Sequence, residues 1–268
     1  MTVAEGCCGC STQPVGTRLG RSARHRQDDR GGAVERGDQC RRLYRRRPHR
    51  KRASNGACHQ RRGAIPTLAS EIASRGIPFI HISTDYVFDG RKGAPYVEQD
   101  EVAPVNAYGR SKLAGERGVA TANPRHVILR TSWVYSPHRK NFVCTIRRLA
   151  AECDRLTIVA DQRGSPTAAI DIAKACLDFA LRCTAAPERA SYGAYHFAGA
   201  GEATWFEFAA TVVELAADRL GRKPQVVPIR TVDYPRPAAR AADTRLGCIV
   251  RRLFGRLASN HGRGGRRS

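Results

Sequence analysis

The composition of the chain changes abruptly near residue 67, and this change limits what can fold. Residues 1–66 contain only eight side chains of the Val, Ile, Leu, Met, Phe, Tyr and Trp types, with no strand or helix periodicity. So small an apolar content cannot offset the conformational entropy that is lost when the backbone is ordered. We therefore predict that residues 1–66 are a basic, low-hydrophobicity segment without a packed core.

Residues 67–246 instead alternate strand-like and helix-like stretches. LASEIASRGIPFIHIS is typical of a helix that stops at Gly76 and leads into a buried strand. HVILRTSWVY and LTIVAD indicate further strands, and the amphipathic runs NAYGRSKLAGERGVAT, NFVCTIRRLAAEC, AIDIAKACLDFALRC and TWFEFAATVVELAADRLG indicate helices. This alternation predicts an α/β fold with a mostly parallel sheet. Residues 247–268 lose the pattern and are predicted to be a basic, disordered tail.

The net charge of +22 is carried mainly by the two ends of the chain. Residues 1–66 hold 16 Lys and Arg against 5 Asp and Glu, and residues 247–268 hold 6 Arg and no acid. The middle is nearly balanced, so nucleic acid is not expected as a partner of the folded part. A nucleic-acid-binding arm stays open for residues 1–66, although Tyr44 is the only Tyr, Phe or Trp there that could stack on bases.

The ten cysteines bear on metal binding and on the compartment of the protein. Cys7 and Cys10 have CxxC spacing, but Cys40 and Cys58-His59 offer no matching second pair, so a zinc site is the weaker alternative. The remaining cysteines have no repeated spacing, which suits a reduced cytoplasmic compartment. No run of about 18 apolar residues is present, so we expect no membrane span. The start MTVAEGCCGC does not have the pattern of a secretory signal.

Polar side chains follow the buried strand that ends near residue 83. Ser83, Thr84 and Asp85 stand where the apolar run stops. Ligands of parallel sheets bind outside the carboxyl ends of the strands, so a hydroxyl and a carboxylate here could hold a polar substrate group. The alternative is a strand-end cap, or an Asx turn leading into Asp89-Gly90.

Tyr108 and Lys112 are four residues apart in a predicted helix, which puts them on one face. A Lys ammonium beside a phenol favours the phenolate and would lower the pKa of the tyrosine toward a range useful for proton transfer. This spacing is weak evidence by itself, because an exposed helical face would look the same. Its position after the strand that ends in Thr84 strengthens the functional interpretation.

The run HISTDYVFDG…APYVEQDEVAPVNAYGRSKLAGE closely resembles the dTDP-4-dehydrorhamnose reductases, which belong to the extended short-chain dehydrogenase/reductases. The similarity continues through ILRTSWVYS, VADQRGSPT, YGAYHFAGAGEATWFEFA and DYPRPAARAADTRL, and covers about residues 67–246. The resemblance implies an NAD(P)-binding Rossmann-like parallel sheet with a smaller C-terminal substrate domain. Residues 67–160 would be the C-terminal half of the Rossmann-like domain, and residues 161–246 the substrate-binding region.

The same resemblance implies the chemistry. NADPH or NADH would reduce the 4-keto group of the nucleotide sugar dTDP-4-dehydro-L-rhamnose to give dTDP-L-rhamnose. Tyr108 would protonate the C4 oxygen, Lys112 would lower the pKa of Tyr108 and bind the nicotinamide ribose, and Thr84 would polarise the carbonyl. Asp85 would bind the sugar or relay a proton, and Trp133 would contact the sugar. A homodimer and a Mg²⁺ requirement stay open, because no motif decides them.

Two of the resembling motifs have simpler structural alternatives. Trp133 could be a tryptophan at the edge of the core. GSPT, residues 164–167, resembles a loop that borders the substrate pocket, but could equally be a turn before a helix with Thr167 as its N-cap.

The glycine-rich turn that such a reductase needs for the cofactor pyrophosphate has no counterpart in residues 1–66. GCCG lacks a strand before it and a helix after it, and GTRLG has the wrong spacing. The excess of Arg, Gly, Ala and Cys suggests that this segment, and the tail after Leu246, are translated out of the family's reading frame. We therefore expect weak NADPH binding, little or no activity and a tendency to aggregate. The alternative is a non-catalytic, reductase-like binding or regulatory protein with a basic nucleic-acid arm.

Overall fold

The structure is a computed structural model that describes residues 64–234 and 238–248. Its main sheet has three parallel strands in the order β1-β2-β7, with the bounds Phe79–Thr84, His126–Thr131 and Gly193–His196. The register sets Ser83 beside Arg130, and Arg130 beside His196. The prediction of an α/β fold with a parallel sheet is confirmed.

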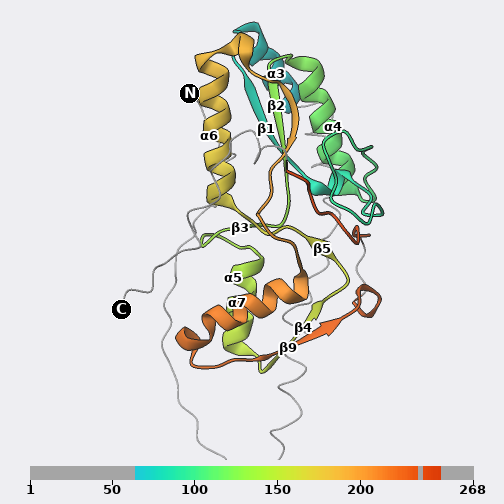
Figure 1. The fold of residues 1–268 in the computed structure, drawn as a ribbon, viewed down its shortest axis with the longest axis vertical. Coiled ribbons are helices and arrows are strands. Elements are labelled where there is room, and N and C mark those ends of the chain that lie inside the picture. Colours follow the sequence, from blue (N-terminus) through green and yellow to red (C-terminus); the bar gives the residue numbers. More distant parts are fainter. Residues whose placement is uncertain (1–63, 235–237, 249–268) are drawn as a thin grey trace, which may run out of the picture.

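Helices cover both faces of this sheet (Figure 1). Helices α3 (Ala64–Ser74) and α4 (Ala107–Ala122) lie on one face, and α6 (Ala169–Ala185) lies on the other. Successive side chains of β2 point to opposite faces, so Ile128 packs against α3 and α4 while Val127 and Leu129 pack against α6. A strand buried on both faces needs an unbroken apolar run, which explains the sequence HVIL.

A second group of elements forms the lower part of the molecule in Figure 1. It contains α5 (Phe142–Glu152), α7 (Trp205–Leu220) and the parallel pair of β4 (Arg155–Val159) and β9 (Gln225–Ile229). Ile146, Leu149 and Val213 are among the buried side chains of its core. This lower core is separate from the clusters that pack on the main sheet.

Short elements connect these two parts. Two further two-stranded pairs are β3 with β6 and β5 with β8, with the bounds Val134–Tyr135, Thr167–Ala168, Arg163–Gly164 and Ala203–Thr204. Three 3₁₀ turns are η1 (Asp85–Val87), η2 (Pro187–Arg189) and η3 (Thr231–Asp233).

Three local features differ from the expectation. The run HVILRTSWVY is two strands rather than one, because the backbone turns at Trp133, whose φ is +45°. Helix α6 is capped by Ala168 without a side-chain bond, so the alternative of Thr167 as its N-cap is wrong. Thr167 lies in β6, where its hydroxyl donates to the Ser165 carbonyl. The first described helix begins at Ala64, slightly before the expected start of the folded part.

The elements on either side of residue 160 are interleaved in space. Helix α6 and strand β7 come from the expected substrate-binding region, yet they pack with β1 and β2 in the main sheet layer. Helix α5 and strand β4 come from the expected Rossmann-like half, yet they pack with α7 and β9. The reason is that the connection from β2 to β7 is long enough to carry both α5 and α6. Residues 1–63 and 249–268, with the expectations made for them, lie outside the described residues.

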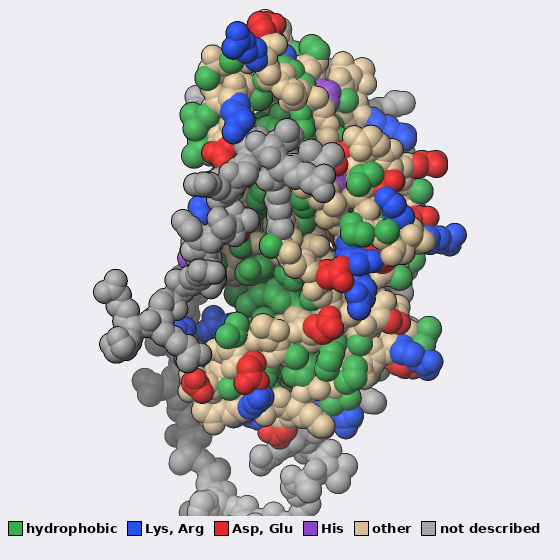
Figure 2. Space-filling model, in the orientation of Figure 1, with side chains coloured by type: hydrophobic (Ala, Val, Ile, Leu, Met, Phe, Trp, Pro, Cys, Tyr) green, Lys and Arg blue, Asp and Glu red, His purple; other side chains and the backbone are tan. Residues whose placement is uncertain are grey.

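The surface of the described part carries both signs of charge. Figure 2 shows Lys and Arg side chains interspersed with Asp and Glu over the visible face. No described helix is long and apolar enough to cross a membrane.

Candidate active site at the end of β1

The site begins where β1 ends. Thr84 caps the following turn η1, because its Oγ1 accepts a hydrogen bond from the Tyr86 amide at 3.3 Å. The same hydroxyl donates to Asp85 Oδ1 at 2.9 Å. The alternative of an Asx turn also holds further along, where the Arg91 amide donates to Asp89 Oδ1 at 3.0 Å. Capping therefore accounts for part of the polar cluster, and it fixes where the Thr84 hydroxyl lies.

Asp85 is buried, with 1% of its surface exposed. Burial raises its pKa to about 6, although hydrogen bonds from Thr244 and Thr84 act in the opposite direction. Its Oδ2 has no hydrogen-bond partner among the described residues. Asp85 is therefore a carboxyl group that can hold or release a proton near neutral pH, directly beside the Thr84 hydroxyl.

Helix α4 places Tyr108 next to Thr84. The helix is capped by Asn106, whose Oδ1 accepts from the Gly109 amide at 2.8 Å, so Tyr108 lies in its first turn. The Tyr108 hydroxyl lies near that of Thr84, which acts to lower the pKa of Tyr108. The Tyr108 ring stands edge-on to Tyr86 with its centroid 6.0 Å away, and 54% of the residue is exposed. The structure thus brings the predicted pair of Thr84 and Tyr108 together.

Lys112 lies one turn further along α4, and its Nζ donates to the Ile82 carbonyl at 2.8 Å. Burial lowers the pKa of Lys112, and the nearby Glu116 carboxylate acts to raise it. The pKa of Tyr108 is raised, first by desolvation of its hydroxyl and also by the negative charge of Asp85. The Tyr–Lys spacing predicted a lowered pKa for Tyr108, whereas the pKa is raised. The reason is that the Lys112 ammonium is directed to the Ile82 carbonyl of β1.

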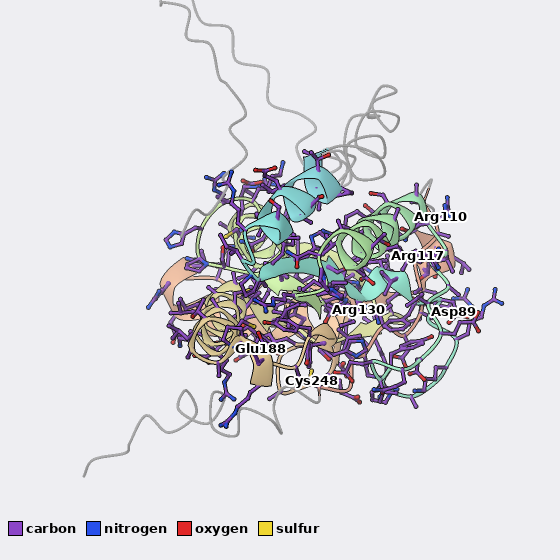
Figure 3. The ribbon with its side chains drawn as sticks, turned by 90° about the horizontal axis from the view of Figure 1, so that it is seen from above. Asp89, Arg110, Arg117, Arg130, Glu188 and Cys248 are labelled. Atoms are coloured by element: carbon purple, nitrogen blue, oxygen red, sulfur yellow. The ribbon has the colours of Figure 1, made fainter. Side chains whose placement is uncertain are left out.

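A buried ion pair beneath the site was not singled out from the sequence. Glu116 on α4 accepts from Arg130 Nη2 at 2.8 Å and from Arg130 Nε at 3.1 Å, and it also accepts a hydrogen bond from Ser83 Oγ. Arg130 is buried, whereas Arg110 and Arg117 of α4 are exposed; all three are labelled in Figure 3. In the sequence, the spacing of four between Lys112 and Glu116 was the signal that could have drawn attention to Glu116.

Trp133 lies in the connection between the main sheet and the lower part. Its indole stacks on that of Trp205 with ring centroids 3.5 Å apart and planes inclined by 5°. Gly164 also approaches the indole so closely that an added Cβ would come within 2.3 Å of the ring. Only 9% of Trp133 is exposed, which agrees with the alternative of a tryptophan at the edge of the core. Trp205 is a partner that the sequence analysis did not identify.

A pocket of about 280 Å³ opens beside this region. It is lined by Pro95, Ser165, Gly199, Ala200, Gly201, Glu202, Arg245, Leu246 and Cys248. Ser165 belongs to the GSPT loop, and its carbonyl accepts a hydrogen bond from Ser132 Oγ at 2.7 Å. Ser165 of the GSPT loop thus lines this pocket, while that the loop borders the substrate stays a prediction. Among the described residues no group of three or more His, Cys, Asp and Glu side chains could hold a metal ion.

Comparison with known proteins identifies the family of the chain. A family model described as the RmlD substrate binding domain matches residues 53–258. A dTDP-4-dehydrorhamnose reductase of Sinorhizobium fredii is 47% identical over 195 residues, which cover 72% of this chain and 66% of the relative. The Escherichia coli protein of the same name is 40% identical over 192 residues, covering 68% of this chain and 60% of the relative. This chain thus spans about two thirds of the length of these relatives, or less.

Solved structures give the same result. A dTDP-4-dehydrorhamnose reductase from Clostridium acetobutylicum is 36% identical with a TM-score of 0.63, and the match covers 70% of this chain and 63% of that one. The Bacillus anthracis protein of that name, solved in complex with NADP, is 34% identical with a TM-score of 0.62 and covers 71% and 64%. The chain therefore belongs to the family of the RmlD substrate binding domain, as its resemblance to the dTDP-4-dehydrorhamnose reductases predicted.

Proposed function

We propose that this site is the catalytic and sugar-binding half of a reductase that converts the 4-keto group of dTDP-4-dehydro-L-rhamnose to the alcohol of dTDP-L-rhamnose. The observation that carries the proposal is the cluster at the carboxyl end of β1, where the Thr84 hydroxyl bonded to Asp85 lies near Tyr108 of α4 and Lys112 lies one turn away on the same helix. The names of the relatives that are 40–47% identical supply the substrate class.

In this proposal the chain's own residues bind the keto group and supply a proton. Tyr108 donates a hydrogen bond to the C4 oxygen, and Thr84 polarises the carbonyl once its one hydroxyl proton turns from Asp85 Oδ1 to the same oxygen. Tyr108 then transfers its proton to that oxygen. A raised pKa keeps Tyr108 protonated and ready to act as an acid. Asp85, whose pKa is about 6, can return a proton when it is protonated: its carboxyl then donates to the Thr84 hydroxyl, which turns its own proton to the Tyr108 oxygen. Trp133 borders the sugar from the side of the GSPT loop.

A reduced nicotinamide, NADPH or NADH, would supply the hydride when bound. The described residues fit one end of it, because Tyr108 is half exposed and Lys112 lies beside it on the same helix face. Residues 1–66, in which the family's glycine-rich turn was sought, do not offer a cradle for the pyrophosphate in their sequence. We therefore propose that the chain binds the nucleotide sugar but holds the cofactor poorly and turns over slowly. A cytoplasmic location, a homodimer and a Mg²⁺ requirement remain predictions.

The test is to follow dTDP-L-rhamnose formation from dTDP-4-dehydro-L-rhamnose and NADPH by chromatography, with the purified chain at high concentration. We expect slow formation that falls about 10²–10⁴-fold in Tyr108→Phe, since that variant removes the acid but keeps the ring. Tyr135→Phe, which lies in β3 away from α4, is the control and should leave the rate unchanged. A Tyr108→Phe variant as active as the parent would contradict the assigned role.

A further inference from the structure

Glu116 joins three elements beneath the site. It accepts hydrogen bonds from Arg130 of β2 at 2.8 Å and 3.1 Å and from Ser83 of β1. Only 4% of the Glu116 side chain and 7% of the Arg130 side chain are exposed. Arg130 also lies over the Phe88 ring, with its guanidinium carbon 5.3 Å from the centroid. The segment that follows η1 is thereby attached to the same group.

These contacts hold the end of β1 at two successive residues. Lys112 Nζ donates to the Ile82 carbonyl, and Glu116, one turn further along α4, accepts from the Ser83 hydroxyl. Thr84 is the next residue of the strand. Tyr108, Lys112 and Glu116 are spaced by four, so they form one row along the side of α4 that meets the strand. The distance between the hydroxyls of Thr84 and Tyr108 therefore depends on the hydrogen bonds that Lys112 and Glu116 of α4 make to β1.

We propose that Glu116, held by Arg130 and Ser83, is a positioning residue that fixes Thr84 against Tyr108 and keeps the charged Lys112 on the Ile82 carbonyl. A buried ion pair is not required for stability, because apolar replacements of similar volume are often as stable. A geometric and electrostatic role accounts for its place directly below the hydroxyls of Thr84 and Tyr108. The proposal rests on the proposed function only for the task given to Thr84 and Tyr108.

The titration of Lys112 reports on the charge of Glu116, because few other charged groups face Lys112. Glu116 lies on its own helix and His81 on β1, and the pKa of His81 is lowered to about 4 by burial and by Lys112, so His81 is neutral at neutral pH. Glu116 is thus the charged group that acts on Lys112, and it raises the pKa of Lys112. If Glu116 only held α4 and the strands together, its negative charge near Lys112 would not be needed.

The test measures the titration midpoint of Lys112 in the full chain by NMR of ¹³C-methylated lysines. The chain has six Lys, and the Lys112 signal is identified by its loss in Lys112→Arg. In Glu116→Gln we expect the midpoint to fall by about 0.5–1 pH unit, as for the loss of a unit charge one helical turn away. Arg117→Met, an exposed neighbour on α4, is the matched control and should leave the midpoint unchanged.

A second variant covers the case in which Glu116→Gln leaves Arg130 unpaired and does not fold. Glu116→Gln/Arg130→Met removes both charges, and it should fold and show a smaller fall in the Lys112 midpoint, because the loss of the Arg130 cation acts in the opposite direction. Product formation in the folded variants should lose kcat at nearly constant KM. A Lys112 midpoint that stays at the parental value in folded variants would overturn the positioning role. If the parent forms no product, the proposed function fails, while the Lys112 titration still decides the positioning role.

Discussion

At the scale of single residues, Asp85 is the side chain whose charge the fold controls most directly. Its ordinary pKa of 3.8 is raised to about 6 because the carboxyl group is buried. Between these two values the folded chain keeps a proton that the unfolded chain has released. Stability therefore falls as the pH rises through this window, and it is flat above the folded pKa. The total loss is about 3 kcal/mol, since each unit of pKa shift is worth about 1.4 kcal/mol.

The substitution Asp85→Asn tests how much stability is lost when the buried Asp85 carboxyl ionises. The amide cannot ionise, so the variant should gain about 2–3 kcal/mol of unfolding free energy over the parent at pH 7–8, and little near pH 4. Urea unfolding followed by circular dichroism at each pH measures the difference. His81 also titrates in this pH range, but its contribution to stability is the same in variant and parent and cancels in the difference.

The control for this prediction is Asp171→Asn on α6, where 49% of the side chain is exposed. It should change the unfolding free energy by little, because the side chain is exposed. A difference between Asp85→Asn and the parent that does not vary with pH would show that the carboxyl group has the same pKa in the folded and the unfolded chain, contrary to the account.

How much of the site the sequence could predict differs from residue to residue. Thr84, Tyr108 and Lys112 could be proposed from the sequence because strand ends and helical spacing are local patterns. Arg130 and Trp205 were not found, because their partners come from distant elements and only the folded chain brings them together. The direction of the Tyr108 pKa was missed for a related reason, since it depends on where the Lys112 ammonium points.

At the scale of elements, the first turn of α4 determines where Tyr108 lies. Gly109 packs so closely on η1 that an added Cβ would lie 2.0 Å from the Tyr86 carbonyl oxygen. No rotamer change relieves a clash with the backbone. Gly109 is therefore needed for the close approach of α4 to the strand end that carries Thr84.

The pair of variants Gly109→Ala and Gly115→Ala tests this close approach. Gly109→Ala should lose about 2 kcal/mol or more of stability and also lower the rate of product formation. Gly115 is the matched control in the same helix, because its added Cβ would meet His81 only at 3.5 Å. Gly115→Ala should be neutral or gain up to about 1 kcal/mol from helix propensity. Equal effects of the two variants, measured by thermal unfolding, would argue against a tight junction at Gly109.

The long elements could be predicted from the sequence, and the short ones could not. Helices α4 to α7 and strands β1, β2 and β4 follow from periodicity over many residues, which local sequence determines. The pairs β3–β6 and β5–β8 have two residues in each strand and exist only because packing brings them together. The break at Trp133 has the same origin, since its stacking on Trp205 comes from α7.

At the scale of the whole molecule, β1 pairs with β2 on one side only within the described part of the chain. Ile77, which precedes β1, is 49% exposed, and Ile82 within it is 45% exposed. Open apolar edge strands are sites of association with other strands. This arrangement supports the expectation from the sequence that the chain tends to aggregate.

The variant Ile82→Thr should therefore reduce concentration-dependent association, as measured by light scattering, because it makes the edge more polar without removing its β-branched shape. Leu215→Thr is the control, since Leu215 is 79% exposed but lies on helix α7. If Leu215→Thr reduced association as much as Ile82→Thr, general surface hydrophobicity rather than the open edge would be the cause.

The measurement that tests the central claim most directly is calorimetric titration of the purified chain with dTDP-L-rhamnose and, separately, with NADPH. The two tryptophans of the chain form the Trp133–Trp205 stack, so their fluorescence reports whether the sugar binds beside it. The account predicts heat and a fluorescence change with dTDP-L-rhamnose, and at most weak binding of NADPH. Tight NADPH binding would contradict the proposed defect in the cofactor half, and no binding of the nucleotide sugar would contradict the site itself.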